Sequence, residues 1–287
     1  MEQDIKSFLE YLSLEKGYSS NTLAAYNNDL SQLVGYVKSV LPEDSNQPYK
    51  LNTEILAGYM LNLKEKKYSQ STVARKIAAA RSFLKYMVDT GRLRSDLKPN
   101  LESPQITKSV PKSLSVSEVR RFLAETGKSS APEAKRDKAM LELLYATGLR
   151  ASELIALNVS DINSKSNNVK CVNRNSKVRV VPIDSYMTQV VTEYIRESRP
   201  KLINNERETA LFTNRRGERL TRQGFWQIIQ GYADKAGLGK KVTPRSLRHS
   251  FAAHRLDGGA DLQSIQKLLG HTHISTTRAY KDIKLIS

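Results

Sequence analysis

Three short stretches in the second half of the chain bring together residue types that could do chemistry. The first, ATGLRASEL at residues 146–154, places an arginine at the turn into an expected helix. The second, TPRSLRHSF at residues 243–251, holds Arg245 and Arg248, and the third, LLGH at residues 268–271, ends on a histidine. Tyr280 follows that histidine by nine residues. Because each residue taken singly is more often structural, the prediction depends on the combination.

Two arginines, a histidine and a tyrosine together suit the cleavage of a phosphodiester. Planar guanidinium groups meet phosphate oxygens with paired hydrogen bonds and keep their charge. Nucleophilic attack places more negative charge on those oxygens, which fixed cations stabilise. A tyrosine has an unperturbed pKa near ~10, so only about one in a thousand is ionised at pH 7. It therefore needs a base or a strongly cationic site in order to attack.

The charge balance indicates a polyanionic partner. The chain has 46 Lys and Arg against 29 Asp and Glu, which gives a formal net charge of +17 and a pI of about 9.8. Such an excess repels itself in a compact fold and usually faces a polyanion. The basic residues are spread over both halves, without an amphipathic anchor or a polybasic tail. This distribution favours nucleic acid over a membrane surface.

The sequence also indicates the cellular compartment of the protein. It has no run of about 18 apolar residues, so no transmembrane helix is expected. The N-terminus begins with acidic residues and no apolar region follows, which argues against a signal peptide. A single cysteine, Cys171, excludes an intramolecular disulfide, and we expect it to be a half-buried strand residue. A cytoplasmic, nucleoid-associated protein is the expectation.

The first half of the chain is expected to be a small helical bundle, residues 1–97. Apolar residues recur at helical spacing in four segments, which begin near residues 4, 20, 53 and 70. The other side of the fourth segment carries four cations, Arg75, Lys76, Arg81 and Lys85. A solvated face and contact with DNA phosphates remain about equally good interpretations of these cations.

The second half, residues 113–287, is expected to be mixed. A capping box at residues 115–118 precedes a helix, and a further helix stops near Gly148. Valines at residues 169–181 around an Asn-Arg-Asn-Ser turn predict a hairpin. Helices are expected at 184–197, 221–236, 245–257, 261–268 and 275–283. The fold class is therefore mainly α with a small β-hairpin or sheet (α+β).

Between the halves, residues 98–112 are expected to form a linker. Three prolines, at 99, 104 and 111, break any helix there. Fully extended, the segment could span roughly 50 Å, enough for two domains to lie on opposite faces of a duplex.

With these motifs in place, the chain resembles the tyrosine recombinases of the phage integrase family, and among them the Xer-like site-specific recombinases. The motifs are Thr-Gly-Leu-Arg-x-x-Glu-Leu and Leu-Gly-His…Thr-Thr-x-x-Tyr, in order and at this separation. The first half resembles the family's helical core-binding (SAM-like) domain, and the second half its catalytic domain. The resemblance covers nearly the whole chain.

The resemblance implies a DNA strand transferase that acts through a 3′-phosphotyrosyl intermediate and a Holliday junction. Four protomers, identical or including a second recombinase, would act on two double-stranded DNA sites without metal or nucleotide cofactor. By position, Tyr280 matches the nucleophile, while Arg150 and Arg248 match the pair that clamps the scissile phosphate. His271 matches the histidine that bonds the same phosphate, and Glu153 the acidic residue that supports the first arginine.

Two positions depart from the family pattern. The hairpin pattern Gly-Lys-Gly-x-Lys-x-Arg here ends at Arg179, a residue expected to contact DNA, and its first lysine, the general acid, is replaced by Arg174. The pattern His-x-x-Arg begins here with Arg245. Arginine is a weaker proton donor than lysine by about two to three pKa units. Either Lys177, in the same hairpin, replaces the lost acid, or Arg174 serves slowly.

These departures leave alternatives open. A catalytically weakened homologue that binds DNA and assists an active partner would give a site-specific gel shift without a covalent product. A type IB topoisomerase-like enzyme, which shares the active-site logic, would relax supercoils without site preference.

Overall fold

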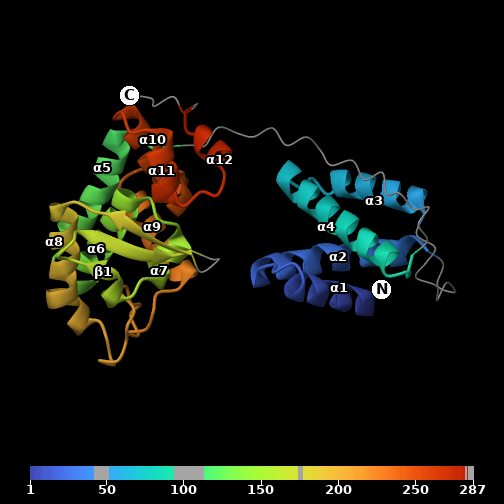
Figure 1. The fold of residues 1–287 in the computed structure, drawn as a ribbon, viewed down its shortest axis with the longest axis horizontal. Coiled ribbons are helices and arrows are strands. Elements are labelled where there is room, and N and C mark those ends of the chain that lie inside the picture. The colour runs from blue at the N-terminus through green and yellow to red at the C-terminus, as the bar shows by residue number, and fades with distance from the viewer. Residues whose placement is uncertain (42–51, 94–112, 174–176, 282, 284–287) are drawn as a thin grey trace. The chain divides into compact units, whose positions relative to one another are not determined.

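The computed structural model describes residues 1–41, 52–93, 113–173, 177–281 and 283 (Figure 1). The chain divides into two compact units, Met1–Lys108 and Ser109–Ser287. Each unit has its own hydrophobic core. The expected linker, residues 98–112, and Arg174 lie outside the described residues. None of the described helices is long and apolar enough to cross a membrane.

The described part of the first unit is a helical bundle in which α2 packs against the other helices (Figure 1). Its helices are α1 (Glu2–Leu14), α2 (Ser20–Val40), α3 (Thr53–Glu65) and α4 (Gln70–Asp89). Three of them begin at a polar residue, Ser19, Asn52 or Ser69, whose side chain accepts a hydrogen bond from the backbone N–H three residues on. These caps satisfy donors that the first helical turn leaves unpaired.

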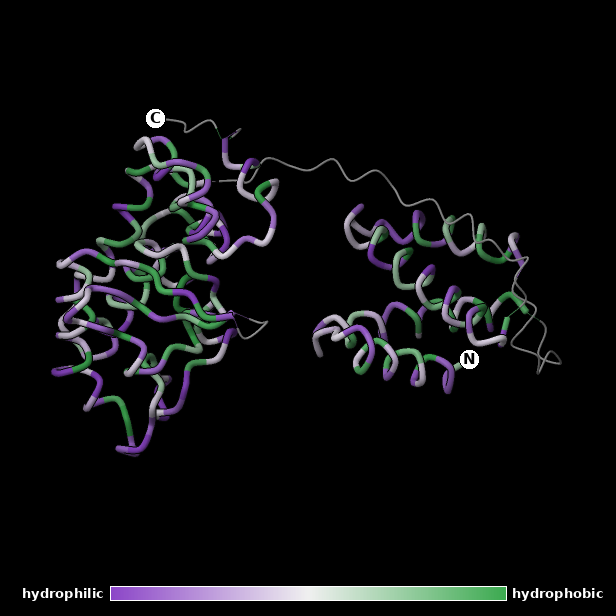
Figure 2. The backbone as a smooth tube through the Cα atoms, in the orientation of Figure 1, coloured by the Kyte–Doolittle hydropathy of each residue, from purple (hydrophilic) through white to green (hydrophobic). Residues whose placement is uncertain are grey.

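The core of the first unit forms because apolar residues recur at the helical period. Apolar and polar residues alternate along each helix, as Figure 2 shows. Phe8, Leu33, Tyr59 and Phe83 are at most 2% exposed and lie between the helices. Burial of each such side chain stabilises the bundle by about 1.5–3 kcal/mol.

The described part of the second unit packs helices around a small sheet (Figure 1). The helices are α5 (Val116–Ala124), α6 (Pro132–Thr147), α7 (Ala151–Ala156), α8 (Ser185–Glu193), α9 (Arg222–Lys235), α10 (Pro244–Asp257), α11 (Leu262–Leu269) and α12 (Ile274–Arg278). Short helical turns are η1 (Glu125–Lys128), η2 (Val159–Asp161), η3 (Tyr194–Ser198), η4 (Arg199–Lys201) and η5 (Gly239–Lys241). The predicted mainly helical class with a small sheet is confirmed.

The sheet is antiparallel, in the order β1 (Ile162–Asn163), β2 (Asn168–Val172) and β3 (Val178–Pro182). The hairpin was expected, and β1 adds a short strand that the sequence did not suggest. Val169, Cys171 and Val181 point into the core. Because strand side chains alternate between faces, Arg179 lies on the same inner side as Val181.

Two local signals expected from the sequence are present in the second unit. Ser115 and Glu118 form the expected capping box at the start of α5. Gly148 ends α6 with a φ of 60°, a left-handed conformation in which an added Cβ would meet the Phe251 ring at 2.4 Å. This turn directs Arg150 to the start of α7. The last predicted helix, 275–283, ends earlier, at Arg278.

Candidate active site

The site is built on the first turn of α7. Glu153 is 4% exposed and accepts hydrogen bonds from the Arg150 backbone N–H at 2.8 Å and from Arg150 Nη1 at 2.9 Å. The carboxylate thus caps its own helix and holds the arginine that begins it. The Arg150 side chain remains 38% exposed, so its guanidinium can reach a ligand.

Arg179 reaches the same carboxylate from β3. Its Nη1 and Nη2 donate to the two oxygens of Glu153 at 2.8 and 2.9 Å, and its Nε donates to the Leu268 carbonyl at 2.9 Å. Burial by itself would raise the pKa of Glu153, but the hydrogen bonds from Arg179 and from the Arg150 backbone outweigh it and hold that pKa at about 2. Arg179 is 14% exposed, and all three of its guanidinium nitrogens donate to oxygens of the protein.

Arg248 enters from α10 and is 7% exposed. Its Nη1 donates to the Gly148 carbonyl at 2.6 Å and its Nη2 to the Leu269 carbonyl at 2.7 Å. Arg248 thus provides hydrogen-bond donors for backbone carbonyls at the C-terminal ends of α6 and α11. Burial, and then repulsion from Arg150, lowers the pKa of Arg248 to about 10, so the group keeps its charge at pH 7.

His271 lies between Arg248 and α12. Its Nε2 is 3.0 Å from Arg248 Nη2, and its Nδ1 is 2.9 Å from the Thr277 hydroxyl. Because a guanidinium only donates, Nε2 accepts and Nδ1–H donates to Thr277. Burial and the neighbouring arginines lower the pKa of His271 to about 4, so the ring is neutral at pH 7.

Tyr280 is 5% exposed, and its ring stacks on His271 with centroids 6.1 Å apart. Its Oη lies 3.0 Å from Nδ1 of His249, and Nε2 of His249 accepts from Arg245 Nε at 3.0 Å. Burial raises the pKa of Tyr280, partly opposed by Arg248, so the phenol is protonated at rest.

The sequence reasoning gave His249 no role. The signal in the sequence that could have pointed to His249 was its spacing of four residues from Arg245, which puts both side chains on one face of a helix. The contact with a tyrosine 31 residues later is a tertiary feature.

The hairpin end borders the same site. An open pocket of about 530 Å³ is lined in part by Arg150, Asn173 and Thr272. The Asn173 backbone N–H donates to the Lys177 carbonyl at 2.9 Å, which extends the β2–β3 pairing by one residue. Strand alternation therefore places Lys177 on the side of Arg179.

The four cations predicted on α4 have different environments. Lys76 is 3% exposed and donates to Asp29 at 2.8 Å, so its ammonium does not fit direct contact with DNA. Arg75 pairs with the same carboxylate but is 43% exposed. Arg81 is exposed. Lys85 is 77% exposed, and its ammonium lies 3.4 Å from the Asp89 carboxylate at the end of α4.

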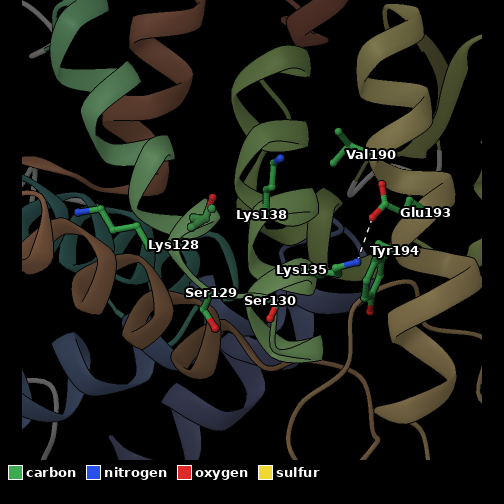
Figure 3. A pocket seen from close by; sticks show the side chains of 10 residues that line it. Lys128, Ser129, Ser130, Lys135, Lys138, Val190, Glu193 and Tyr194 are labelled. Carbon is green, nitrogen blue, oxygen red and sulfur yellow. Dashed lines mark hydrogen bonds and ion pairs between the residues drawn. The ribbon is translucent and has the colours of Figure 1, made fainter.

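A second pocket, of about 470 Å³, lies between the start of α6 and α8 (Figure 3). Lys135 reaches Glu193 at 3.0 Å, as Figure 3 shows. It also lies 3.4 Å from Glu197, so acidic groups offset its charge. None of the described residues that line this pocket was predicted to do chemistry.

Two family descriptions together match most of the chain. The Phage integrase family matches residues 112–285, and the Phage integrase N-terminal SAM-like domain matches residues 5–91. Tyrosine recombinase XerC of Herpetosiphon aurantiacus is 41% identical, over 99% of this chain and 91% of its own. Tyrosine recombinase XerD of Listeria innocua is 39% identical, over 99% of this chain and 95% of its own.

Solved structures show the same fold. The XerH site-specific recombinase bound to its palindromic difH substrate, in a post-cleavage complex, superimposes with a TM-score of 0.78. It is 19% identical and covers 98% of this chain and 81% of its own. The chain therefore belongs to the phage integrase family, as a site-specific tyrosine recombinase that cuts and rejoins DNA.

Proposed function

We propose that Tyr280 attacks the scissile phosphate of a double-stranded recombination site, which leaves a 3′-phosphotyrosyl bond and a free 5′-hydroxyl. Arg150 and Arg248 hold the phosphate oxygens, and His271 hydrogen-bonds the same phosphate. The strands then rejoin by the reverse reaction, through a Holliday junction.

The charge around Glu153 carries this proposal. Among the described residues, the guanidinium groups of Arg150, Arg179 and Arg248 lie within 4.0 Å of that carboxylate. Three positive charges and one negative charge leave a net of +2, with both nearby histidines neutral. A phosphodiester carries one negative charge, and its pentacovalent transition state gains another. The site is thus matched to the transition state more closely than to the substrate.

We assign Arg179 and Glu153 to positioning rather than to contact with DNA. The carboxylate fixes Arg150, and Arg179 ties the hairpin to the carboxylate and to the end of α11. Rigid support of this kind keeps the phosphate-binding groups in place without reorganisation during the reaction.

The leaving 5′-oxygen needs a proton, and Lys177 is the better candidate donor. Its backbone is paired with Asn173, which lines the pocket next to Arg150. A lysine ammonium is also the stronger acid. Lys177→Ala is expected to abolish cleavage while sparing DNA binding. If Arg174 is the acid instead, Lys177→Ala will cleave normally and Arg174→Lys will be faster than the wild type.

The partner is a recombination site in duplex DNA, bound by four protomers on two sites. Support comes from relatives named XerC and XerD at about 40% identity, from the XerH recombinase bound to its difH substrate and from the Tn1549 transposon integrase in complex with a circular intermediate DNA. In the first unit, the exposed cations Arg75, Arg81 and Lys85 would contact the DNA backbone. Such a protein acts at the nucleoid, in the cytoplasm.

A suicide substrate tests the proposal. DNA carrying a nick beside the cleavage point traps the covalent intermediate, because the short strand diffuses away. We expect a covalent protein–DNA product with the wild type and none with Tyr280→Phe, which retains the gel shift. A site-specific shift without covalent product from the wild type would instead indicate a DNA-binding homologue.

A further inference from the structure

His249 makes a contact that the proposed mechanism does not use. Its Nδ1 is 3.0 Å from the phenolic oxygen of Tyr280, with ring centroids 5.3 Å apart. On its other side, Arg245 Nε lies 3.0 Å from Nε2. Both ring nitrogens therefore have a defined partner, and α10 carries both the histidine and the arginine.

The partners determine which nitrogen carries the proton. A guanidinium has donors only, so Nε2 must offer its lone pair to Arg245. Burial, and then the charges of Arg245 and Arg248, lower the pKa of His249 to about 4, so the ring holds one proton at pH 7. That proton is on Nδ1, and Nδ1–H donates to the oxygen of Tyr280.

We propose that His249 is a catalytic residue that donates its Nδ1–H to the attacking oxygen of Tyr280, and that Arg245 is a positioning residue that fixes this tautomer. The inference rests on the proposed function, in which Tyr280 is the nucleophile. It gives Arg245, which departs from the family pattern, a specific task in this chain.

The tautomer has a chemical consequence. A donor aimed at the phenolic oxygen stabilises the phenolate as it forms and orients the remaining lone pairs towards the phosphorus. The same ring cannot take the phenolic proton, because the nitrogen that faces the oxygen is already protonated. The phenolic oxygen of Tyr280 therefore loses its proton to water. At the same time the bond from Oη to phosphorus forms and the bond from phosphorus to the 5′-oxygen breaks. The leaving oxygen receives its proton from the general acid.

Nuclear magnetic resonance of the free protein tests the tautomer without any need for activity. In the ¹⁵N-labelled full chain at pH 7.5, we expect His249 to be protonated at Nδ1 and unprotonated at Nε2. Arg245→Met should shift the ring towards the Nε2–H form, whereas Arg255→Met, on the same helix beside Phe251, should leave it unchanged. An Nε2–H ring in the wild type, or a ring insensitive to Arg245→Met, would overturn the proposal.

Cleavage of the nicked substrate tests the catalytic role. His249→Asn keeps an amide N–H near the position of Nδ1, whereas His249→Leu keeps the volume and removes the donor. We expect cleavage to be about 10²-fold slower in His249→Leu, with His249→Asn several-fold closer to the wild type. If the histidine only packs against the tyrosine, leucine will be tolerated at least as well as asparagine, and the catalytic role is refuted.

The two experiments separate this inference from the proposed function. Thermal unfolding by circular dichroism identifies any variant that fails to fold, and the spectra of the wild type still determine the tautomer. If the wild type forms no Tyr280-dependent covalent product, the proposed function fails and the catalytic role of His249 fails with it. If that product forms but the spectra show Nε2–H, this inference alone fails.

Discussion

Replacement of Glu153 by glutamine should destabilise the second unit more than any change of a surface carboxylate. The variant keeps the shape of the side chain and part of the capping box. It removes the negative charge that Arg150, Arg179 and Arg248 surround. Three buried or half-buried cations then repel one another without a counterion.

The magnitude follows from the acidity of the carboxyl group. The pKa of Glu153 is about 2, against an ordinary value of 4.5. Each tenfold change in acidity corresponds to about 1.4 kcal/mol, so ionised Glu153 favours the folded state by about 3 kcal/mol. We expect Glu153→Gln to lower the free energy of unfolding by about 2–4 kcal/mol at pH 7.

Urea unfolding followed by tryptophan fluorescence would measure the loss. The chain has one tryptophan, Trp226 on α9, so the signal reports the second unit alone. The matched control is Glu197→Gln, a half-exposed carboxylate in surface ion pairs with Arg196 and Lys135, which should leave the urea midpoint unchanged.

The pH dependence supplies a second check. A carboxyl whose pKa is lowered in the folded state stabilises it fully above the unfolded pKa, and the effect is lost as pH falls through the folded pKa. The difference between wild type and Glu153→Gln should be constant above about pH 4.5 and shrink between 4.5 and 2. A variant that unfolds at the wild-type urea concentration at pH 7 would refute the account of this site.

Other predictions concern charge. Arg248→Lys cannot satisfy both carbonyls that the guanidinium fork reaches, so nicked-substrate cleavage should fall by about 10²-fold or more. The pKa values of His249 and His271 are about 4 against an ordinary 6.5. The free energy of unfolding of the wild type should therefore fall as pH drops from 6.5 to 4. Urea unfolding should show a smaller fall in a His249→Asn, His271→Gln double variant. Lys76→Met should lower the thermal stability of the first unit and leave the salt dependence of DNA binding unchanged, whereas Lys85→Met should reduce that salt slope by about one. With six to ten phosphate contacts, wild-type DNA affinity should fall by about 10³ to 10⁵ between 50 and 200 mM salt; a flat response would contradict the electrostatic argument.

Sequence patterns were informative wherever the information is local. The capping box at Ser115 and the helix end at Gly148 both involve residues within a few positions of each other. Side-chain hydrogen bonds of this range form in the isolated segment as well as in the fold. The last helix was predicted too long, because Tyr280 and its neighbours leave the helical path to pack against α10 and α11.

The burial of charged side chains could not be predicted from local sequence in the same way. Lys76 and Arg179 are cations in a strongly basic chain. Arg179 was expected to contact DNA, and for Lys76 a solvated face and contact with DNA were about equally good interpretations. In the structure each is committed to a buried carboxylate, Lys76 to Asp29 and Arg179 to Glu153. Nothing in the local sequence distinguishes a cation that meets phosphate from one that meets an acid 47 or 26 residues away.

The sequence by itself determined the helical bundle, the mixed second half and the family, because these depend on periodicity, turn residues and motif spacing. Only the tertiary structure decided that Glu153 collects three guanidinium groups and that His249 contacts Tyr280. Those contacts join α7, β3, α10 and the segment after α12, which are far apart in the chain. Their energies depend on distances and burial that exist only after the elements have packed.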